Sequence, residues 1–172
     1  MSKILIFGNS GSGKSTLAKQ LSAEYNLVHL DLDSLAWQDC TAPIRKPLAD
    51  SKVQIDAFIC ANTGWVIEGC YADLIVFAQG ASDQAIFLDL SVKACIENAK
   101  KRPWEAHKYP SKQAQQRNLP MLLQWITDYY SRQGCFSHSA HLEFYQQYQG
   151  EKRIIRENLS ADNSYSTAAV GS

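Results

Sequence analysis

The segment from Gly8 to Ser15 has the residue types and the spacing of a phosphate-binding loop. Its sequence, Gly-Asn-Ser-Gly-Ser-Gly-Lys-Ser, satisfies the Walker A pattern G-x-x-x-x-G-K-[ST] and follows a short apolar run, as that pattern requires. Glycines let backbone N–H groups turn inward around phosphate oxygens at the positive N-terminal end of a helix. The alternative, a glycine-rich turn without a ligand, would not require lysine and serine at positions 14 and 15.

This loop predicts a site for a nucleoside triphosphate and Mg²⁺. Lys14 is expected to reach the β- and γ-phosphates, which makes it a catalytic residue, and the Ser15 hydroxyl is expected to bind Mg²⁺. The predicted nucleotide-binding residues are Gly8, Asn9, Ser10, Gly11, Ser12, Gly13, Lys14, Ser15 and Thr16.

Carboxylates stand at the ends of two further apolar runs. Asp31 and Asp33 follow the run 27–30, and residues two apart in an extended chain face the same way. We assign Asp31 to Mg²⁺, and Asp33 to catalysis and to the hydroxyl of a phosphate acceptor. Glu68 ends the run 65–68, where a Walker-B-type acid would hold the water shell of the metal. The alternative for the aspartates is a solvated turn or a helix cap.

Cys135, His138 and His141 have the spacing C-x-x-H-x-x-H, which could indicate zinc. A structural zinc site needs four ligands, and no second cluster in the sequence completes this one. We therefore predict that the protein binds no zinc.

Composition and charge narrow the class of protein. A chain of 172 residues that is 45% hydrophobic and 20% charged is typical of a single globular domain. Seventeen basic residues balance seventeen acidic ones, so direct binding to nucleic acid is not expected. Basic residues nevertheless outnumber acidic ones between residues 93 and 117, which makes this segment a candidate surface for anions.

Cysteine use and hydropathy indicate the compartment. The five cysteines form an odd set without a repeated spacing, and the N-terminus lacks the pattern of a signal peptide. No apolar run approaches the roughly 18 residues that span a bilayer. We expect a cytoplasmic protein that does not enter a membrane.

The elements that must position these residues alternate along the chain. Strands are predicted at 3–7, 27–30, 65–68, 85–89 and 152–156. Helices are predicted at 13–25, 48–61 and 91–101. A further helix is predicted to begin at Asn118 and Pro120, with Trp125, Tyr129 and Tyr130 in the core. A last helix is predicted from Ser137 or Ser139 to Tyr148. Such alternation predicts an α/β three-layer sandwich, in which a five-stranded parallel sheet carries helices on both faces. The predicted division is one domain at 1–157 and a flexible tail at 158–172.

The chain resembles the adenylate-kinase-like group of P-loop kinases. The Gly8–Ser15 loop is the most specific match, and Asp31-Leu32-Asp33, Gly69-Cys70-Tyr71 and Arg102-Pro103 are shorter ones. Within the group it is similar to shikimate-kinase-type enzymes and to bacterial topology modulation proteins. The likeness covers about residues 1–157. Cys70 departs from the glycine pair of shikimate kinases, and the helical segment 118–148 is closer to the topology modulation group.

The resemblance also implies roles for residues outside the loop. It implies that Asp33, Arg45, Gly69 and Tyr71 bind the acceptor. It also implies that a basic helical lid at about 102–117 carries Arg102 over the phosphates as a catalytic cation. The alternative for Arg102 is a solvated helix end whose charge complements the helix dipole.

Two functions are compatible with these residues. The first is an ATP- and Mg²⁺-dependent phosphotransferase, a kinase that acts on a small molecule and binds no membrane. The second is a nucleotide-binding regulator or slow NTPase, in which bound nucleotide orders the 93–117 segment for a partner. A kinase needs polar groups that converge beside the γ-phosphate, whereas a switch needs only water there.

Overall fold

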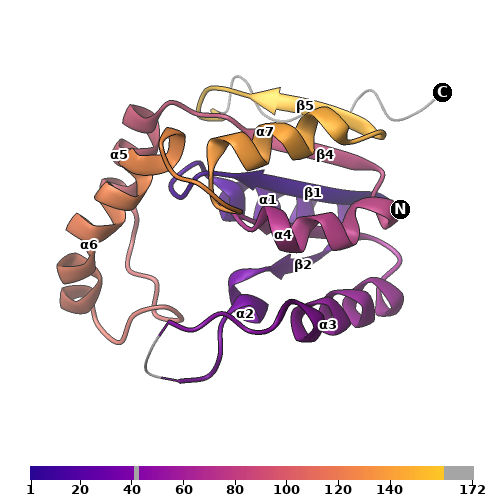
Figure 1. The fold of residues 1–172 in the computed structure, drawn as a ribbon, viewed down its shortest axis with the longest axis horizontal. Helices are drawn as coiled ribbons and strands as arrows, with labels where there is room; N and C mark the ends of the chain where they lie inside the picture. Colours follow the sequence, from indigo (N-terminus) through magenta and orange to yellow (C-terminus); the bar gives the residue numbers. More distant parts are fainter. Residues whose placement is uncertain (41–42, 161–172) are drawn as a thin grey trace.

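One open sheet of five strands forms the centre of the computed structural model, which describes residues 1–40 and 43–160 (Figure 1). The strands are β1 (Lys3–Gly8), β2 (Val28–Asp31), β3 (Trp65–Gly69), β4 (Gln84–Leu88) and β5 (Glu151–Ile155). Their order is β2-β3-β1-β4-β5, and every neighbouring pair is parallel. The chain adds strands on one side of β1 and then on the other. In such sheets, ligands bind in the crevice at the carboxyl ends of the strands where this reversal occurs.

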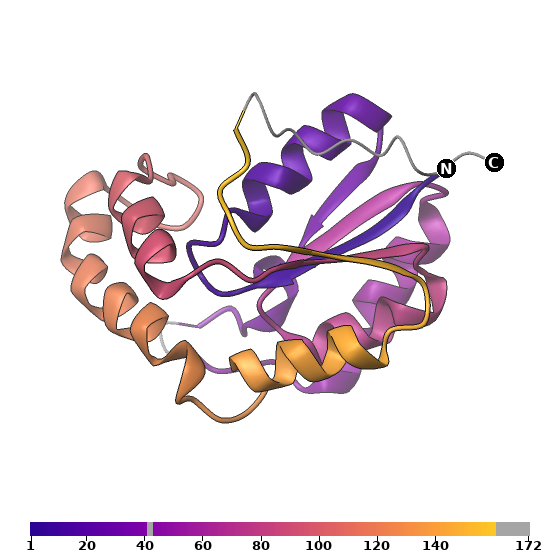
Figure 2. The ribbon, with the colours of Figure 1, turned by 90° about the horizontal axis from the view of Figure 1, so that it is seen from above.

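Helices cover both faces of the sheet, as Figure 2 shows. One face packs against α1 (Lys14–Tyr25), α5 (Val92–Lys101) and Ile126 of α6 (Lys112–Thr127). The other face packs against α2 (Asp33–Ala36), α3 (Leu48–Ala61), α4 (Ala72–Ile75) and α7 (His138–Gln147). Two short 3₁₀ helices, η1 (Val76–Ala81) and η2 (Asp128–Tyr130), complete the fold.

The residues of β1 explain why the sheet has two cores. Leu5 and Phe7 belong to one buried cluster and Ile4 and Ile6 to the other, because successive side chains of a strand point to opposite faces. A central strand buried on both faces reads as a continuous apolar run, which is the pattern in the sequence. The predicted three-layer α/β sandwich with a five-stranded parallel sheet is confirmed.

The start of α6 differs from the prediction. The helix begins at Lys112 rather than near Asn118, and Pro120 lies inside it. The Ser111 hydroxyl accepts a hydrogen bond from the backbone N–H of Ala114 at 3.0 Å and so caps the helix. The polar residues 112–117 are mostly good helix formers, and apolar periodicity alone does not detect them.

The burial of the aromatic residues at the end of this helix also differs in part from the prediction. Tyr129 is buried as predicted, whereas Trp125 and Tyr130 are 39% and 56% exposed, so their predicted place in the core is wrong. The change from α6 to the tighter η2 alters the rotation per residue, and the three rings no longer share one face.

Residues 161–172 lie outside the described residues, so most of the predicted tail at 158–172 is not part of this description. Within the described residues, no helix has both the length and the apolar character needed to cross a membrane.

Candidate active site

A cavity of about 830 Å³ lies at the carboxyl edge of the sheet. The loop after β1 lines one part of it. Asp31 and Glu68 at the ends of β2 and β3, and Asp33 at the start of α2, line another part. Residues 101–109, from the end of α5 and the connection to α6, line a further side. The topology therefore brings the motif and the strand-end carboxylates together.

The loop after β1 depends on glycine at two close approaches. Gly8 and Gly11 have φ of 152° and 76°, values that other residues rarely adopt. A Cβ atom at Gly8 would lie 2.5 Å from the carbonyl oxygen of Leu88, and one at Gly11 would lie 2.4 Å from that of Cys95. Both glycines are thus required by packing against β4 and α5, in addition to any role in phosphate binding.

Lys14 and Ser15 begin α1 and point toward the strand ends. The Lys14 ammonium donates a hydrogen bond to the carbonyl oxygen of Asn9 at 2.8 Å, within its own loop. The Ser15 hydroxyl donates to Oε1 of Glu68 at 2.6 Å. Asp31 and Glu68 stand directly opposite each other on β2 and β3, so the three predicted metal-binding residues lie together.

Asp31 is in an environment that disfavours its charge. Burial, followed by the nearby carboxylates of Glu68 and Asp33, raises the pKa of Asp31 to about 6. Its Oδ1 accepts a hydrogen bond from the backbone N–H of Asp33 at 2.9 Å. A cation placed between Asp31 and Glu68 would relieve this repulsion.

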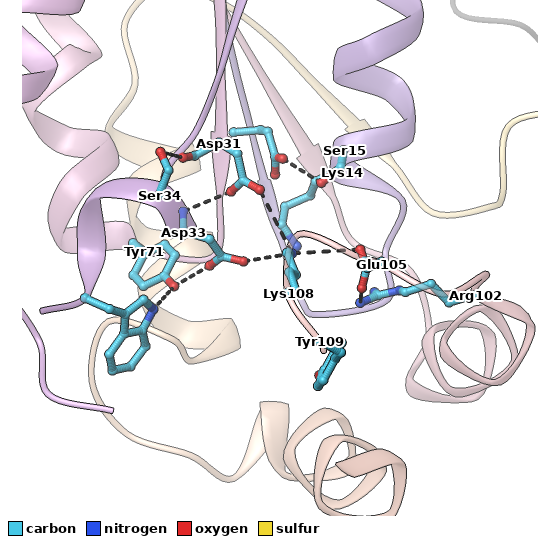
Figure 3. A network of polar contacts seen from close by, with 12 residues as sticks. Lys14, Ser15, Asp31, Asp33, Ser34, Tyr71, Arg102, Glu105, Lys108 and Tyr109 are labelled. Atoms are coloured by element: carbon cyan, nitrogen blue, oxygen red, sulfur yellow. Dashed lines mark hydrogen bonds and ion pairs between the residues drawn. The ribbon is translucent and has the colours of Figure 1, made fainter. Parts of the chain in front are cut away.

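Asp33 is held from two sides, as Figure 3 shows. The hydroxyl of Tyr71 donates to its Oδ1, and the ammonium of Lys108 donates to its Oδ2 at 3.0 Å. The indole N–H of Trp37 in turn donates to the Tyr71 oxygen at 2.8 Å. Burial acts to raise the pKa of Asp33, but Lys108 and the hydrogen bond from Tyr71 outweigh it and lower the pKa. Asp33 is therefore held as a carboxylate.

Sequence reasoning placed Lys108 only among the basic residues of the segment 93–117 and did not pair it with Asp33. Lys108 lies in the irregular segment between α5 and α6, and its Nζ is 3.0 Å from Asp33 and 4.0 Å from Asp31. Burial acts to lower the pKa of Lys108, yet the charges of Asp33 and Asp31 raise it overall. Glu105 lies between Lys108 and Arg102, at 3.9 Å from the first and 3.3 Å from the second (Figure 3).

The structure separates the predicted acceptor-binding residues. Gly69 lines the cavity, whereas Tyr71 is 2% exposed and reaches it only through its hydrogen bond to Asp33. Arg45 lies outside the cavity lining, where it pairs with Asp73 at 3.1 Å. Its guanidinium lies over the rings of Trp37, Tyr71 and Phe136.

The three residues that could have suggested zinc have separate partners. His141 contacts the Tyr129 hydroxyl and the carbonyl oxygen of Cys70, His138 contacts Asp89, and Cys135 contacts Arg45. Across residues 1–40 and 43–160, no group of three or more His, Cys, Asp or Glu is arranged to hold a metal ion. That the protein binds no zinc stays a prediction.

The residues assigned to Mg²⁺ offer suitable donors. Ser15, Asp31 and Glu68 present hydroxyl and carboxylate oxygens, the hard ligands that Mg²⁺ prefers. Mg²⁺ usually keeps several waters and takes other ligands from substrate phosphates, so a site with few protein ligands beside a phosphate-binding loop fits it.

Comparison with known proteins supports the fold. No family model matches the sequence, and no curated protein is similar to it. Among solved structures, the shikimate kinase from Acinetobacter baumannii in complex with shikimate is 15% identical with a TM-score of 0.51, over 95% of this chain and 88% of that one. The chain has the fold of a P-loop kinase.

Two more proteins align over most of their length. The shikimate kinase from Bacteroides thetaiotaomicron is 16% identical with a TM-score of 0.48, over 90% of this chain and 86% of that chain. The deoxyadenosine kinase from M. mycoides with bound dATP is 16% identical with a TM-score of 0.43, over 93% of each chain. The similarity to the Acinetobacter baumannii structure confirms the P-loop kinase fold inferred from the sequence. The acceptor must be argued from the residues of this chain.

Proposed function

We propose that the protein is a phosphotransferase that moves the γ-phosphoryl group of ATP onto a hydroxyl of a small molecule, with Mg²⁺. One observation carries the proposal: a carboxylate of lowered pKa, Asp33, shares a cavity with the phosphate-binding loop and Lys14. A nucleotide switch needs no such group beside the phosphates.

The residues divide the work of phosphoryl transfer. The backbone N–H groups of the Gly8–Ser15 loop bind phosphate oxygens, and Lys14 leaves Asn9 to bind the β- and γ-phosphates. Asp33 accepts the proton of the acceptor hydroxyl and orients its oxygen toward phosphorus. Ser15, Asp31 and, through water, Glu68 would hold Mg²⁺, which when bound neutralises phosphate charge.

Nucleotide binding is the first test. A ligand at about 100 times its Kd stabilises the folded state by about 2.7 kcal/mol, which raises the Tm of a chain of this size by roughly 5 to 10 °C. We expect ATP with Mg²⁺ to produce such a shift in the wild type and Lys14→Ala to reduce it. An unchanged Tm of the wild type at millimolar ATP and Mg²⁺ would contradict the proposal.

Transfer is the second test. Purified protein with labelled ATP and Mg²⁺ is screened against shikimate, gluconate, nucleoside monophosphates and other hydroxylated metabolites. We expect a labelled acceptor product that Lys14→Ala does not form. Hydrolysis of ATP that no acceptor accelerates would instead favour a slow NTPase or a regulator.

A further inference from the structure

The position of Lys108 suggests more than a structural ion pair. Its Nζ lies 3.0 Å from Oδ2 of Asp33, while the other oxygen of Asp33 accepts the Tyr71 hydroxyl. An acceptor hydroxyl that gives its proton to Asp33 must reach one of these oxygens. Because Tyr71 is buried and also bonded to Trp37, Oδ2 is the oxygen that can be freed.

An acceptor hydroxyl can replace Lys108 at Oδ2 of Asp33 with little loss of stability. The side chains of Lys108 and Asp33 are 28% and 41% exposed, and ion pairs this accessible to water contribute little to stability. Lys108 also stands on an irregular segment bounded by Pro103 and Pro110, outside the helices on either side. Lys108 can therefore leave Asp33 without loss of a buried or helical contact.

Arg102 is less well placed for the same task. Its guanidinium pairs with Glu105, which separates it from Lys108 and from the aspartates (Figure 3). Among the described residues, Lys108 is the one cation of the segment 102–111 that forms an ion pair with Asp31 or Asp33.

We propose that Lys108 is a further catalytic residue, which occupies Asp33 in the absence of substrates and moves to the transferred phosphoryl group during the reaction. This inference rests on the proposed phosphotransferase function. The acceptor oxygen forms a bond to γ-phosphorus and gives its proton to Asp33. The bond from γ-phosphorus to the bridging oxygen breaks, and ADP leaves with the electron pair. Lys108 forms no covalent bond and stabilises the charge on the oxygens in transfer.

The contrast between two bound complexes tests this role without a known acceptor. ADP with Mg²⁺ represents the ground state, and the same nucleotide with aluminium fluoride places a mimic of the transferred group in the cavity. A cation that serves the transition state contributes mainly to the second complex. Cations in this role are worth about 10³ or more in rate. We therefore expect Lys108→Met to weaken the fluoride complex by at least about tenfold, with ADP affinity changed less than about threefold.

A matched variant and the wild type make each outcome decisive. Lys112 begins α6 and does not line this cavity, so Lys112→Met should alter neither complex. Lys108→Arg should bind the aluminium fluoride complex more tightly than Lys108→Met does, because it keeps the positive charge. The inference would be overturned if wild type and Lys108→Met bound ADP, Mg²⁺ and aluminium fluoride with equal affinity. It would also be overturned if the wild type bound this combination no more tightly than ADP with Mg²⁺ alone. In both cases the evidence for nucleotide binding would stand. A wild type that binds no ADP with Mg²⁺ would overturn the proposed function itself.

Discussion

Two aspartates that are two positions apart illustrate how local surroundings divide chemical roles. Burial and the carboxylate of Glu68 raise the pKa of Asp31, whereas Lys108 and Tyr71 lower the pKa of Asp33. The sequence shows identical side chains, and only their partners distinguish them. Asp31 is suited to share a cation with Glu68, and Asp33 is suited to accept a proton as a carboxylate that is already ionised.

Substitution of each aspartate should therefore give a different defect. Asp33→Asn removes the proton acceptor, so we expect phosphoryl transfer to fall by about 10² to 10⁴ with ATP affinity little changed. Asp31→Asn removes a carboxylate from the Mg²⁺ site, so we expect half-maximal activity to need more Mg²⁺. Transfer rates measured over a Mg²⁺ titration separate the two. Identical Mg²⁺ dependence in both variants would refute the assignment.

The strands and the longer helices were predictable because each has a pattern of apolar residues within one continuous stretch of sequence. Buried parallel strands leave uninterrupted apolar runs, and helix α3 has the bounds 48–61 that its apolar spacing predicts. Helices α2 and α4 have four residues each, which is too short for a periodic pattern. The prediction missed the start of α6 because the first turns of this helix carry no apolar stripe.

The site was predictable to the same extent. The loop was predictable from its motif, and the aspartates and Glu68 from their positions at or just after predicted strands. A parallel topology brings these positions to one edge of the sheet. The partners of Asp33 are not: Lys108 is 75 positions away and Tyr71 is 38 positions away. Such contacts depend on how two irregular connections fold over the sheet, for which local sequence has no signal.

The capped start of α6 has a consequence for the segment that carries Lys108. Gln115, in the first turn of the helix, accepts a hydrogen bond from the backbone N–H of Glu105 at 2.9 Å and donates one to the carbonyl oxygen of Pro103 at 3.1 Å. The helix start thus fixes the backbone of this segment before Lys108.

Loss of the cap should therefore be measurable. We expect Ser111→Ala to lower the free energy of unfolding by about 1 kcal/mol, as for other N-cap serines. Ser111→Asp is the matched control, because aspartate caps a helix as well as serine does, and it should retain the stability of the wild type. Urea unfolding of the three proteins is the measurement. A loss with aspartate equal to that with alanine would show that the hydroxyl is not acting as a cap.

His141 connects distant parts of the whole molecule. Its side chain is fully buried under the sheet face covered by α7, and its Nδ1 and Nε2 lie 2.6 Å from the Tyr129 hydroxyl and 2.9 Å from the carbonyl oxygen of Cys70. It thereby ties α7 to η2 and to the connection that follows β3. Burial, which disfavours the charged ring, lowers the pKa of His141 to about 4.

This lowered pKa predicts how the stability of the whole fold depends on pH. Between the unfolded pKa of about 6.5 and the folded value of about 4, the unfolded chain binds more protons at this residue, so acid favours unfolding. The contribution of His141 is complete above pH 6.5 and is lost as pH falls to 4, by at most about 3 kcal/mol. His141→Gln keeps a donor and an acceptor but does not titrate. We expect it to be less stable than wild type at pH 7, with a smaller further loss between pH 6.5 and 4.

The control is His107→Gln, which removes an exposed histidine from the segment between α5 and α6. This substitution leaves the buried His141 in place, so it should keep the wild-type pH dependence. Urea unfolding at several pH values, without nucleotide or Mg²⁺, gives the free energy for each protein. If His141→Gln loses as much stability toward pH 4 as the wild type, a different buried group links this fold to pH.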